Sequence, residues 1–97
     1  MRKLFDETKI NGMMLANRLV RSATWEGMCD AAGRPTAKLG SFYAHLARGR
    51  VGLVITGYSF IRPDGRQLPG QMGIHTDDFA AEMQALTAAV HHQGGKI

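Results

Sequence analysis

The sequence predicts an α/β fold built on a parallel sheet, and three observations lead to this prediction. Short apolar runs alternate with longer segments of helical periodicity, which is the pattern of βαβ units. The segment 51–56 is a nearly continuous apolar run, as expected of a strand that is buried on both faces. The composition, 44% hydrophobic and 21% charged, is that of a globular chain and excludes disordered, collagen-like and low-complexity proteins.

The first expected element is a β-hairpin over residues 8–16. Asn11-Gly12 lies between short apolar flanks, and this dipeptide favours a type I′ turn, in which both central residues have positive φ. A short strand is expected over residues 19–24, where two apolar residues lead into small polar ones. Residues 26–36 are expected to form a loop because Gly, Asp and Pro recur in them.

A first helix is expected to begin near Thr36, which is a good N-cap residue directly after a proline. Apolar residues recur in it at helical spacing and form one stripe, namely Leu39, Phe42, Tyr43, Leu46 and Ala47. Arg48 gives the last turn a positive charge, and Gly49 is expected to end the helix as its C′ glycine. The buried strand over residues 51–56 then follows.

Residues 61–75 are expected to form a second loop, and another helix is expected from Thr76. Asp77 and Asp78 suit the positive first turn of that helix, whose buried stripe consists of Phe79, Met83, Leu86 and Val90. Gly94-Gly95 would end it, and residues 96–97 would open a third strand. The order of hairpin, strand, helix, strand, helix and start of a strand is that of the beginning of a larger α/β domain.

The charge pattern does not predict a nucleic-acid partner. The formal net charge is +4, but the 12 basic residues are scattered along the chain, without a basic helix face or interleaved aromatic residues. No apolar run is long enough to span a membrane, and the N-terminus lacks the apolar segment of a signal peptide. The single cysteine suits a reducing compartment. We therefore expect a cytoplasmic protein without a nucleic-acid or membrane partner.

The sequence contains no P-loop, no zinc-ligand spacing and no nucleophile elbow. His45 is expected to be structural, and His91 and His92 are adjacent on a helix, where neighbouring side chains point in different directions. Cys29 is expected to be an inert thiol because no basic residue lies near it in the sequence. We therefore predict no metal site and no catalytic residue within the chain.

The ends of the two predicted strands are the best candidates for a binding site. Sites in parallel α/β folds form outside the carboxyl ends of the strands. Residues 22–26 and 56–59 each combine small residues, a hydroxyl group and one aromatic ring, which belongs to Trp25 or Tyr58. This combination would suit a planar cofactor with polar edges. The alternative is that both rings only cap the core, with their polar tips in solvent.

Several motifs together resemble the old yellow enzyme family of FMN-dependent NAD(P)H:flavin oxidoreductases. Residues 17–24, Asn-Arg-Leu-Val-Arg-Ser-Ala-Thr, resemble the first strand of that family, and residues 51–58 resemble its second strand. The connection that follows is matched by residues 62–66 and 73–77, and residues 91–97 resemble the lead into the third strand. The motifs occur in the right order over the whole length of the chain.

The resemblance implies a (β/α)8 TIM barrel, of which residues 1–97 would form the N-terminal quarter of an FMN-binding domain. By position, Ala23, Thr24, Trp25 and Tyr58 would contact FMN, and NAD(P)H would be the reductant. Three of these residues depart from the family pattern. Many members carry a proline in place of Ala23, a threonine or cysteine that tunes the flavin in place of Trp25, and a small residue in place of Tyr58.

The resemblance further implies an oxidoreductase that reduces an electron-poor alkene, an enone or an enoyl thioester, by hydride transfer from flavin. The family's substrate-binding pair, its proton donor and its phosphate-binding loops correspond to positions beyond residue 97. One alternative is therefore a truncated, inactive fragment that self-associates through its open sheet. The other is a small basic module that binds an anion or nucleic acid, which would require steeply salt-dependent binding.

Overall fold

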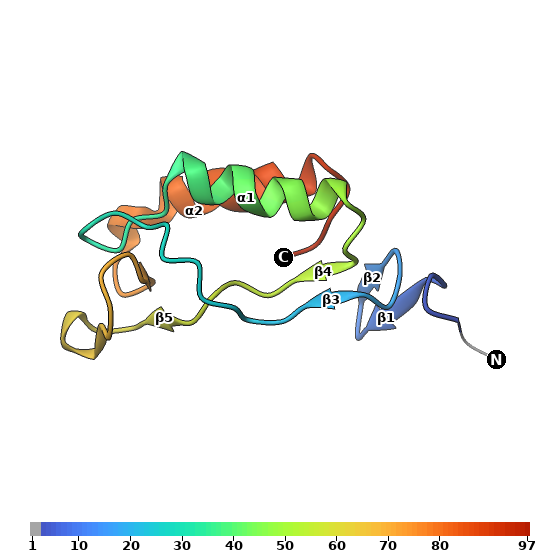
Figure 1. Cartoon of the computed structure of the whole chain (residues 1–97), viewed down its shortest axis with the longest axis horizontal. Coiled ribbons are helices and arrows are strands. Elements are labelled where there is room, and N and C mark those ends of the chain that lie inside the picture. The colour runs from blue at the N-terminus through green and yellow to red at the C-terminus, as the bar shows by residue number, and fades with distance from the viewer. Residues whose placement is uncertain (1–2) are drawn as a thin grey trace.

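The computed structural model describes residues 3–97 and arranges them in two layers, with overall dimensions of 47 × 23 × 22 Å (Figure 1). Helices α1 (Ala37–Arg48) and α2 (Ala80–His91) lie side by side in one layer. Strands β3 (Val20–Arg21) and β4 (Leu53–Val54) pair in parallel in the other. The buried core between the layers consists of Leu39, Tyr43, Ala47, Val54, Met72, Leu86 and Val90. The alternation of strands and helices that the sequence predicts is confirmed.

The predicted hairpin is present, but its turn differs from the prediction. Strands β1 (Thr8–Ile10) and β2 (Met13–Leu15) pair antiparallel, and Ile10 lies opposite Met13. Only Asn11 of the two turn residues has positive φ, at 51°, so the predicted type I′ geometry is wrong. Glycine adopts either sign of φ without steric cost, and Asn-Gly therefore fixed the position of the turn without fixing its type.

The two parallel strands are shorter than predicted. The first was expected to reach Thr24 but ends at Arg21, because Arg21 Nη1 donates to the carbonyl oxygen of Ile55 (3.0 Å) where the ladder would have continued. Burial of the second strand on both faces is also wrong. Val54 faces the helices and is buried, whereas Ile55 is 45% exposed, since no second layer covers its face within residues 3–97.

Helix α1 begins as predicted, and the Thr36 hydroxyl accepts a hydrogen bond from the Leu39 amide (3.2 Å). Its C-terminus is displaced by one residue from the prediction. Gly49 has φ −74° and the left-handed residue is Arg50, with φ 72°. The amide of Arg50 donates to Ala47 and that of the next residue donates to Leu46, which together form a Schellman motif. The hydrogen bonds of this motif place Arg50 in the left-handed region, although the neighbouring glycine would adopt positive φ more easily.

The segment expected to be a plain loop contains further structure. Strand β5 (Ser59–Phe60) pairs in parallel with β6 (Met72–Gly73), and a short 3₁₀ helix, η1 (Pro63–Gly65), lies between them. The Gly73 amide donates to the Gly33 carbonyl oxygen (2.9 Å) of the first loop. The prediction of a loop over 61–75 was wrong at η1 and β6, because β6 pairs with a strand on the other side of the turn and also contacts the first loop.

The second helical segment begins at Thr76 as predicted, but its first turn is a 3₁₀ helix, η2 (Asp77–Phe79), which leads into α2. Gly94 has φ 79° and ends this segment. The Lys96 carbonyl oxygen then accepts from the Val54 amide (2.8 Å), so the chain runs beside β4 where a third strand was predicted. Within the described residues, neither α-helix has the length and apolar character that a bilayer span requires.

Candidate cofactor-binding site

The four residues predicted to contact a cofactor lie at the carboxyl ends of the paired strands. Ala23, Thr24 and Trp25 follow β3, and Tyr58 follows β4. The rings of Trp25 and Tyr58 face each other with centroids 5.7 Å apart and an angle of 49° between their planes. They are 41% and 43% exposed, so a large part of each side chain is open to solvent. The structure thus brings the rings of Trp25 and Tyr58 together beyond the ends of the two strands.

The backbone between β3 and Trp25 carries polar groups that point to no partner within residues 3–97. No hydrogen bond forms from the amides of Ala23 or Thr24 to another group of this part of the chain. The Thr24 hydroxyl donates to the Ser22 carbonyl oxygen (2.9 Å). Ser22, Ala23 and Thr24 are all exposed. Two aromatic faces and free amide donors therefore lie together at this edge of the sheet.

A buried ion pair lies beneath these exposed residues. Arg21 Nη2 is 2.9 Å from Glu26 Oε2, and their side chains are only 13% and 10% exposed. Arg21 also donates to the carbonyl oxygens of Ile55 and Thr24, each at 3.0 Å. Its guanidinium carbon lies 5.7 and 5.5 Å from the ring centroids of Phe42 and Tyr43 on α1. The ion pair thus connects the first strand end, the second strand end and the helix layer.

Tyr43 connects the same site to the core. Its hydroxyl accepts from the Gly57 amide (3.2 Å), and its side chain is fully buried. Burial raises the pKa of Tyr43 to about 12, and the negative charge of Glu26 adds to the effect. The hydroxyl therefore stays protonated at neutral pH and holds the end of β4 in place.

Sequence analysis placed Tyr43 in the apolar stripe of the first helix and gave Arg21, Glu26 and Tyr43 no individual role in the site. The available signal was a pair of opposite charges five residues apart on either side of a strand end, at Arg21 and Glu26. The prediction that Cys29 is unreactive agrees with its environment. Burial, together with the charges of Glu26 and Asp30, raises the pKa of the thiol to about 11. Among residues 3–97, no group of three or more His, Cys, Asp or Glu side chains could hold a metal ion.

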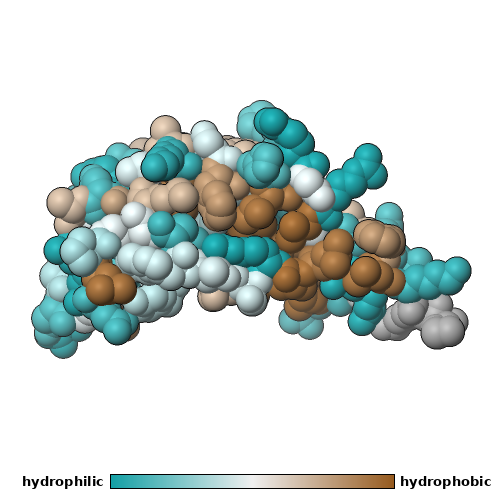
Figure 2. All heavy atoms as spheres, in the orientation of Figure 1, coloured by the Kyte–Doolittle hydropathy of each residue, from teal (hydrophilic) through white to brown (hydrophobic). Residues whose placement is uncertain are grey.

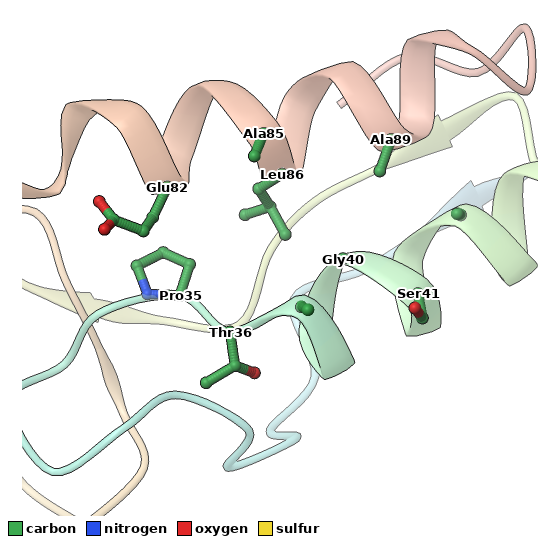
Figure 3. Close-up of a pocket in the computed structure, with 10 residues that line it drawn as sticks. Pro35, Thr36, Gly40, Ser41, Glu82, Ala85, Leu86 and Ala89 are labelled. Atoms are coloured by element: carbon green, nitrogen blue, oxygen red, sulfur yellow. The ribbon is translucent and has the colours of Figure 1, made fainter.

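A separate hollow of about 360 Å³ lies between the two helices, away from the strand ends (Figure 3). Small residues line much of it, and Glu82 of α2 points toward Pro35 at its rim. The Glu82 carboxylate is already bound by Arg34 Nη1 at 2.6 Å, which lowers the pKa of Glu82 from its ordinary value. This groove contains none of the four predicted contact residues, and we do not assign it a cofactor.

Comparison with known proteins adds the family context. A model of the NADH:flavin oxidoreductase / NADH oxidase family matches residues 3–97. An NADPH dehydrogenase of Bacillus subtilis is 36% identical over 101 residues, covering 99% of this chain and 29% of that protein. An NADH oxidase of Thermoanaerobacter brockii is 30% identical, covering 97% of this chain and 15% of the relative. The chain thus spans less than a third of the length of these relatives.

The fold is also similar to that of solved structures. The old yellow enzyme homologue from Zymomonas mobilis superposes with a TM-score of 0.87 at 28% sequence identity. The match covers 97% of this chain and 26% of that one. The chain accordingly has the fold of an α/β segment of such a TIM barrel, as the sequence motifs implied.

Proposed function

The chain belongs to the NADH:flavin oxidoreductase / NADH oxidase family, and we propose that it forms one flank of the FMN site of an NAD(P)H-dependent oxidoreductase. In this proposal residues 1–97 are the N-terminal quarter of the FMN-binding barrel domain. Ala23, Thr24, Trp25 and Tyr58 are the residues that contact the cofactor. The observation that supports the proposal most directly is the exposed Trp25–Tyr58 pair beside two unpaired amides at the strand ends.

The residues present fit the ring system of FMN. A planar ring with polar edges needs an apolar face on which to lie and donors at its rim, and the strand ends supply both. Gly57 keeps this edge narrow, because a Cβ atom there would lie 2.3 Å from Glu26 Oε1 and 3.0 Å from the Thr24 carbonyl oxygen. Both terminal nitrogens of Arg21 donate to other groups of the chain, so the exposed donors of the site are neutral amides.

The chain's own residues would bind and orient the cofactor and exclude water from one of its sides. The rings of Trp25 and Tyr58 supply the contact area, and the amides of Ala23 and Thr24 supply directional donors. FMN, when bound, supplies the chemistry of hydride transfer from a reduced nicotinamide to a substrate. No side chain of this segment is assigned a proton-transfer role.

The substrate class that we propose is an electron-poor alkene, either an enone or an enoyl thioester. Relatives named as an NADPH dehydrogenase and an NADH oxidase support a reduced nicotinamide as the electron donor. The alkene itself is inferred from the resemblance to old yellow enzymes. We also propose that the 97-residue chain by itself does not turn over substrate, because it corresponds to only 29% of the length of the Bacillus subtilis relative.

The test begins with the protein that carries this sequence, purified without denaturation, and with its intact mass. We expect a bound flavin that chromatography identifies as FMN, and oxidation of NADH or NADPH on addition of an enone. Trp25→Ala and Tyr58→Ala should each weaken FMN binding about tenfold, since each removes one aromatic face. Phe5→Ala is the matched control, because Phe5 is 73% exposed on the segment that precedes β1. A protein that neither contains nor binds FMN would contradict the proposal.

A further inference from the structure

Arg21 has an unusual position for a charged side chain. It is the last residue of β3, and its side chain is 13% exposed. Its contacts reach three parts of the fold, namely the turn after β3, the end of β4 and helix α1. Nη1 donates to the Ile55 carbonyl oxygen past the end of β4, and Nη2 donates to the Thr24 carbonyl oxygen in the turn. Such a buried charge is costly unless it is hydrogen-bonded, and here Nη1 and Nη2 donate to backbone carbonyl oxygens and to Glu26.

These contacts replace the sheet hydrogen bonds that would otherwise continue. Ile55 already donates its amide to the Arg21 carbonyl oxygen (2.9 Å), which is the last rung between the strands. The next rung would need the Ile55 carbonyl oxygen as acceptor for the Ala23 amide, but the guanidinium group occupies that acceptor. The turn after β3 is thereby released from the sheet, and the Ala23 amide is left free on the exposed side.

Glu26 closes the same turn from its other end. Its Oε2 atom binds Arg21, and its Oε1 atom lies against Gly57, so that a Cβ atom at position 57 would approach it to 2.3 Å. The indole ring of Trp25, the preceding residue, lies over Gly27, whose φ is 63° and whose added Cβ would be 2.9 Å from the ring. Glu26 therefore fixes the distance between the turn and Gly57, the residue directly before Tyr58.

We propose that Arg21 and Glu26 are positioning residues for the cofactor-facing turn 22–25, a role that rests on the proposed function. Their buried ion pair substitutes for the sheet at the strand ends. It fixes the free amides of Ala23 and Thr24 and the indole of Trp25 relative to Tyr58. The two charged side chains act through the backbone and through their neighbours. A merely structural ion pair would affect stability without affecting the cofactor or the environment of Trp25.

The test compares Arg21→Met with a matched control in the same protein. Arg34→Met removes a second ion pair, in which Arg34 binds Glu82 at 2.6 Å and lies 4.7 Å from the Phe79 ring centroid, away from the strand ends. Three quantities are measured for each variant: the thermal midpoint, the Kd for FMN, and the emission and acrylamide quenching of Trp25, the sole tryptophan of the sequence.

We expect Arg21→Met to raise the Kd for FMN about tenfold or more and to make Trp25 more accessible to quencher. Arg34→Met should lower the thermal midpoint and leave the other two quantities unchanged. The proposal is overturned if the two variants behave alike at comparable loss of stability, or if Arg21→Met changes neither the Kd nor the quenching.

Glu26→Gln is the second variant, and it tests the proposal independently if Arg21→Met does not fold. It keeps the volume and one acceptor oxygen but removes the charge, so a smaller change in the same direction is expected. Unchanged FMN affinity and unchanged Trp25 quenching in Glu26→Gln would overturn the proposal.

Failure of the proposed function is recognised separately, because the wild-type protein would then bind no FMN. The Trp25 measurement still decides the positioning role in that case, since it needs no cofactor.

Discussion

Asn17 illustrates how a single buried side chain shapes the fold around it. Its amide nitrogen donates to the Arg50 carbonyl oxygen (2.7 Å), and its Oδ1 accepts from the Leu19 amide (3.0 Å). Gly52 lies directly against it, and a Cβ atom there would be 2.5 Å from Asn17 Oδ1. The amide thus joins the start of β3 to the turn that follows α1, and position 52 has room only for glycine.

Cys29 gives a prediction about thiol reactivity. Because burial and the neighbouring Glu26 and Asp30 raise its pKa to about 11 from 9.0, the folded chain holds about a hundredfold less thiolate at pH 8 than the unfolded chain. Alkylation by iodoacetamide, followed by mass spectrometry, should be slower by a similar factor without urea than with it. Asp30→Asn should speed the folded-state reaction. Equal rates in the two states would show that the thiol is not shielded.

Tyr43 gives a prediction about alkaline pH. Its pKa is raised to about 12 from 10.0, so the folded state holds the proton more tightly than the unfolded state. The resulting stability is fully present below pH 10 and is lost as the pH rises through 12. In a Cys29→Ala background, which removes the other raised pKa, the free energy of unfolding should fall by about 2–3 kcal/mol over this range.

The matched variant for this prediction is Tyr43→Phe in the same background. It should show no such fall above pH 10. It should also be less stable by about 1 kcal/mol at neutral pH, because the Gly57 amide loses its acceptor. Urea denaturation at a series of pH values measures both quantities. An identical pH dependence in the two proteins would exclude Tyr43 as the titrating group.

The two helices end in the same hydrogen-bond pattern but with different residues. After α1 the left-handed position is Arg50, with φ 72°, and after α2 it is Gly94, with φ 79°. In each case the following amide donates to a carbonyl oxygen five residues earlier, namely Leu46 or Val90. The backbone requirement is the same at both ends, whereas only the second end carries the residue type that meets it without strain.

This difference predicts opposite effects of two substitutions. Arg50→Gly should stabilise the protein by about 0.5–1 kcal/mol, because it removes a Cβ atom from the left-handed region. Gly94→Ala should destabilise it by about 1 kcal/mol. The cause would be the positive φ of residue 94 and not a steric clash, since nothing lies within 4 Å of the added Cβ. Chemical denaturation measures both. Destabilisation by Arg50→Gly would mean that the arginine side chain makes a contact worth more than the strain.

At the scale of the whole molecule, the helices cover one face of the sheet and leave the other open. Val20 of β3 is 48% exposed, and Ile55, directly after β4, is 45% exposed. Figure 2, which views the two layers from the side, shows apolar surface gathered around the hairpin and the adjoining strands. An apolar sheet face with unpaired strand edges favours association with another chain.

We therefore predict that the 97-residue chain self-associates when it is isolated. Sedimentation at several concentrations should show species larger than 10.6 kDa. Val20→Lys combined with Ile55→Lys should shift the distribution toward the monomer, because each lysine places a charge on the apolar face. Ile61→Lys is the control, since Ile61 is 72% exposed outside the strand pair. A wild-type chain that stays monomeric at high concentration would contradict the prediction.

The sequence by itself determined the alternation of the hairpin, the paired strands and the two helices, and where the helical segments start, and it located the candidate site at the strand ends. These follow from local properties, namely apolar periodicity, the N-cap residues Thr36 and Thr76, and small residues at strand ends. Family membership was also accessible from the sequence because motifs in the right order cover the whole chain.

Only the tertiary structure decided where the strands end, which residue takes the left-handed position after α1, and that β5 pairs with β6. It also revealed the ion pair between Arg21 and Glu26 and its contacts with Ile55 and Tyr43. One of these features, the hydrogen bond between Arg21 and Ile55, joins groups 34 residues apart in the sequence. A hydrogen bond between such groups leaves no periodic trace in the sequence, so it becomes visible only when the chain is folded.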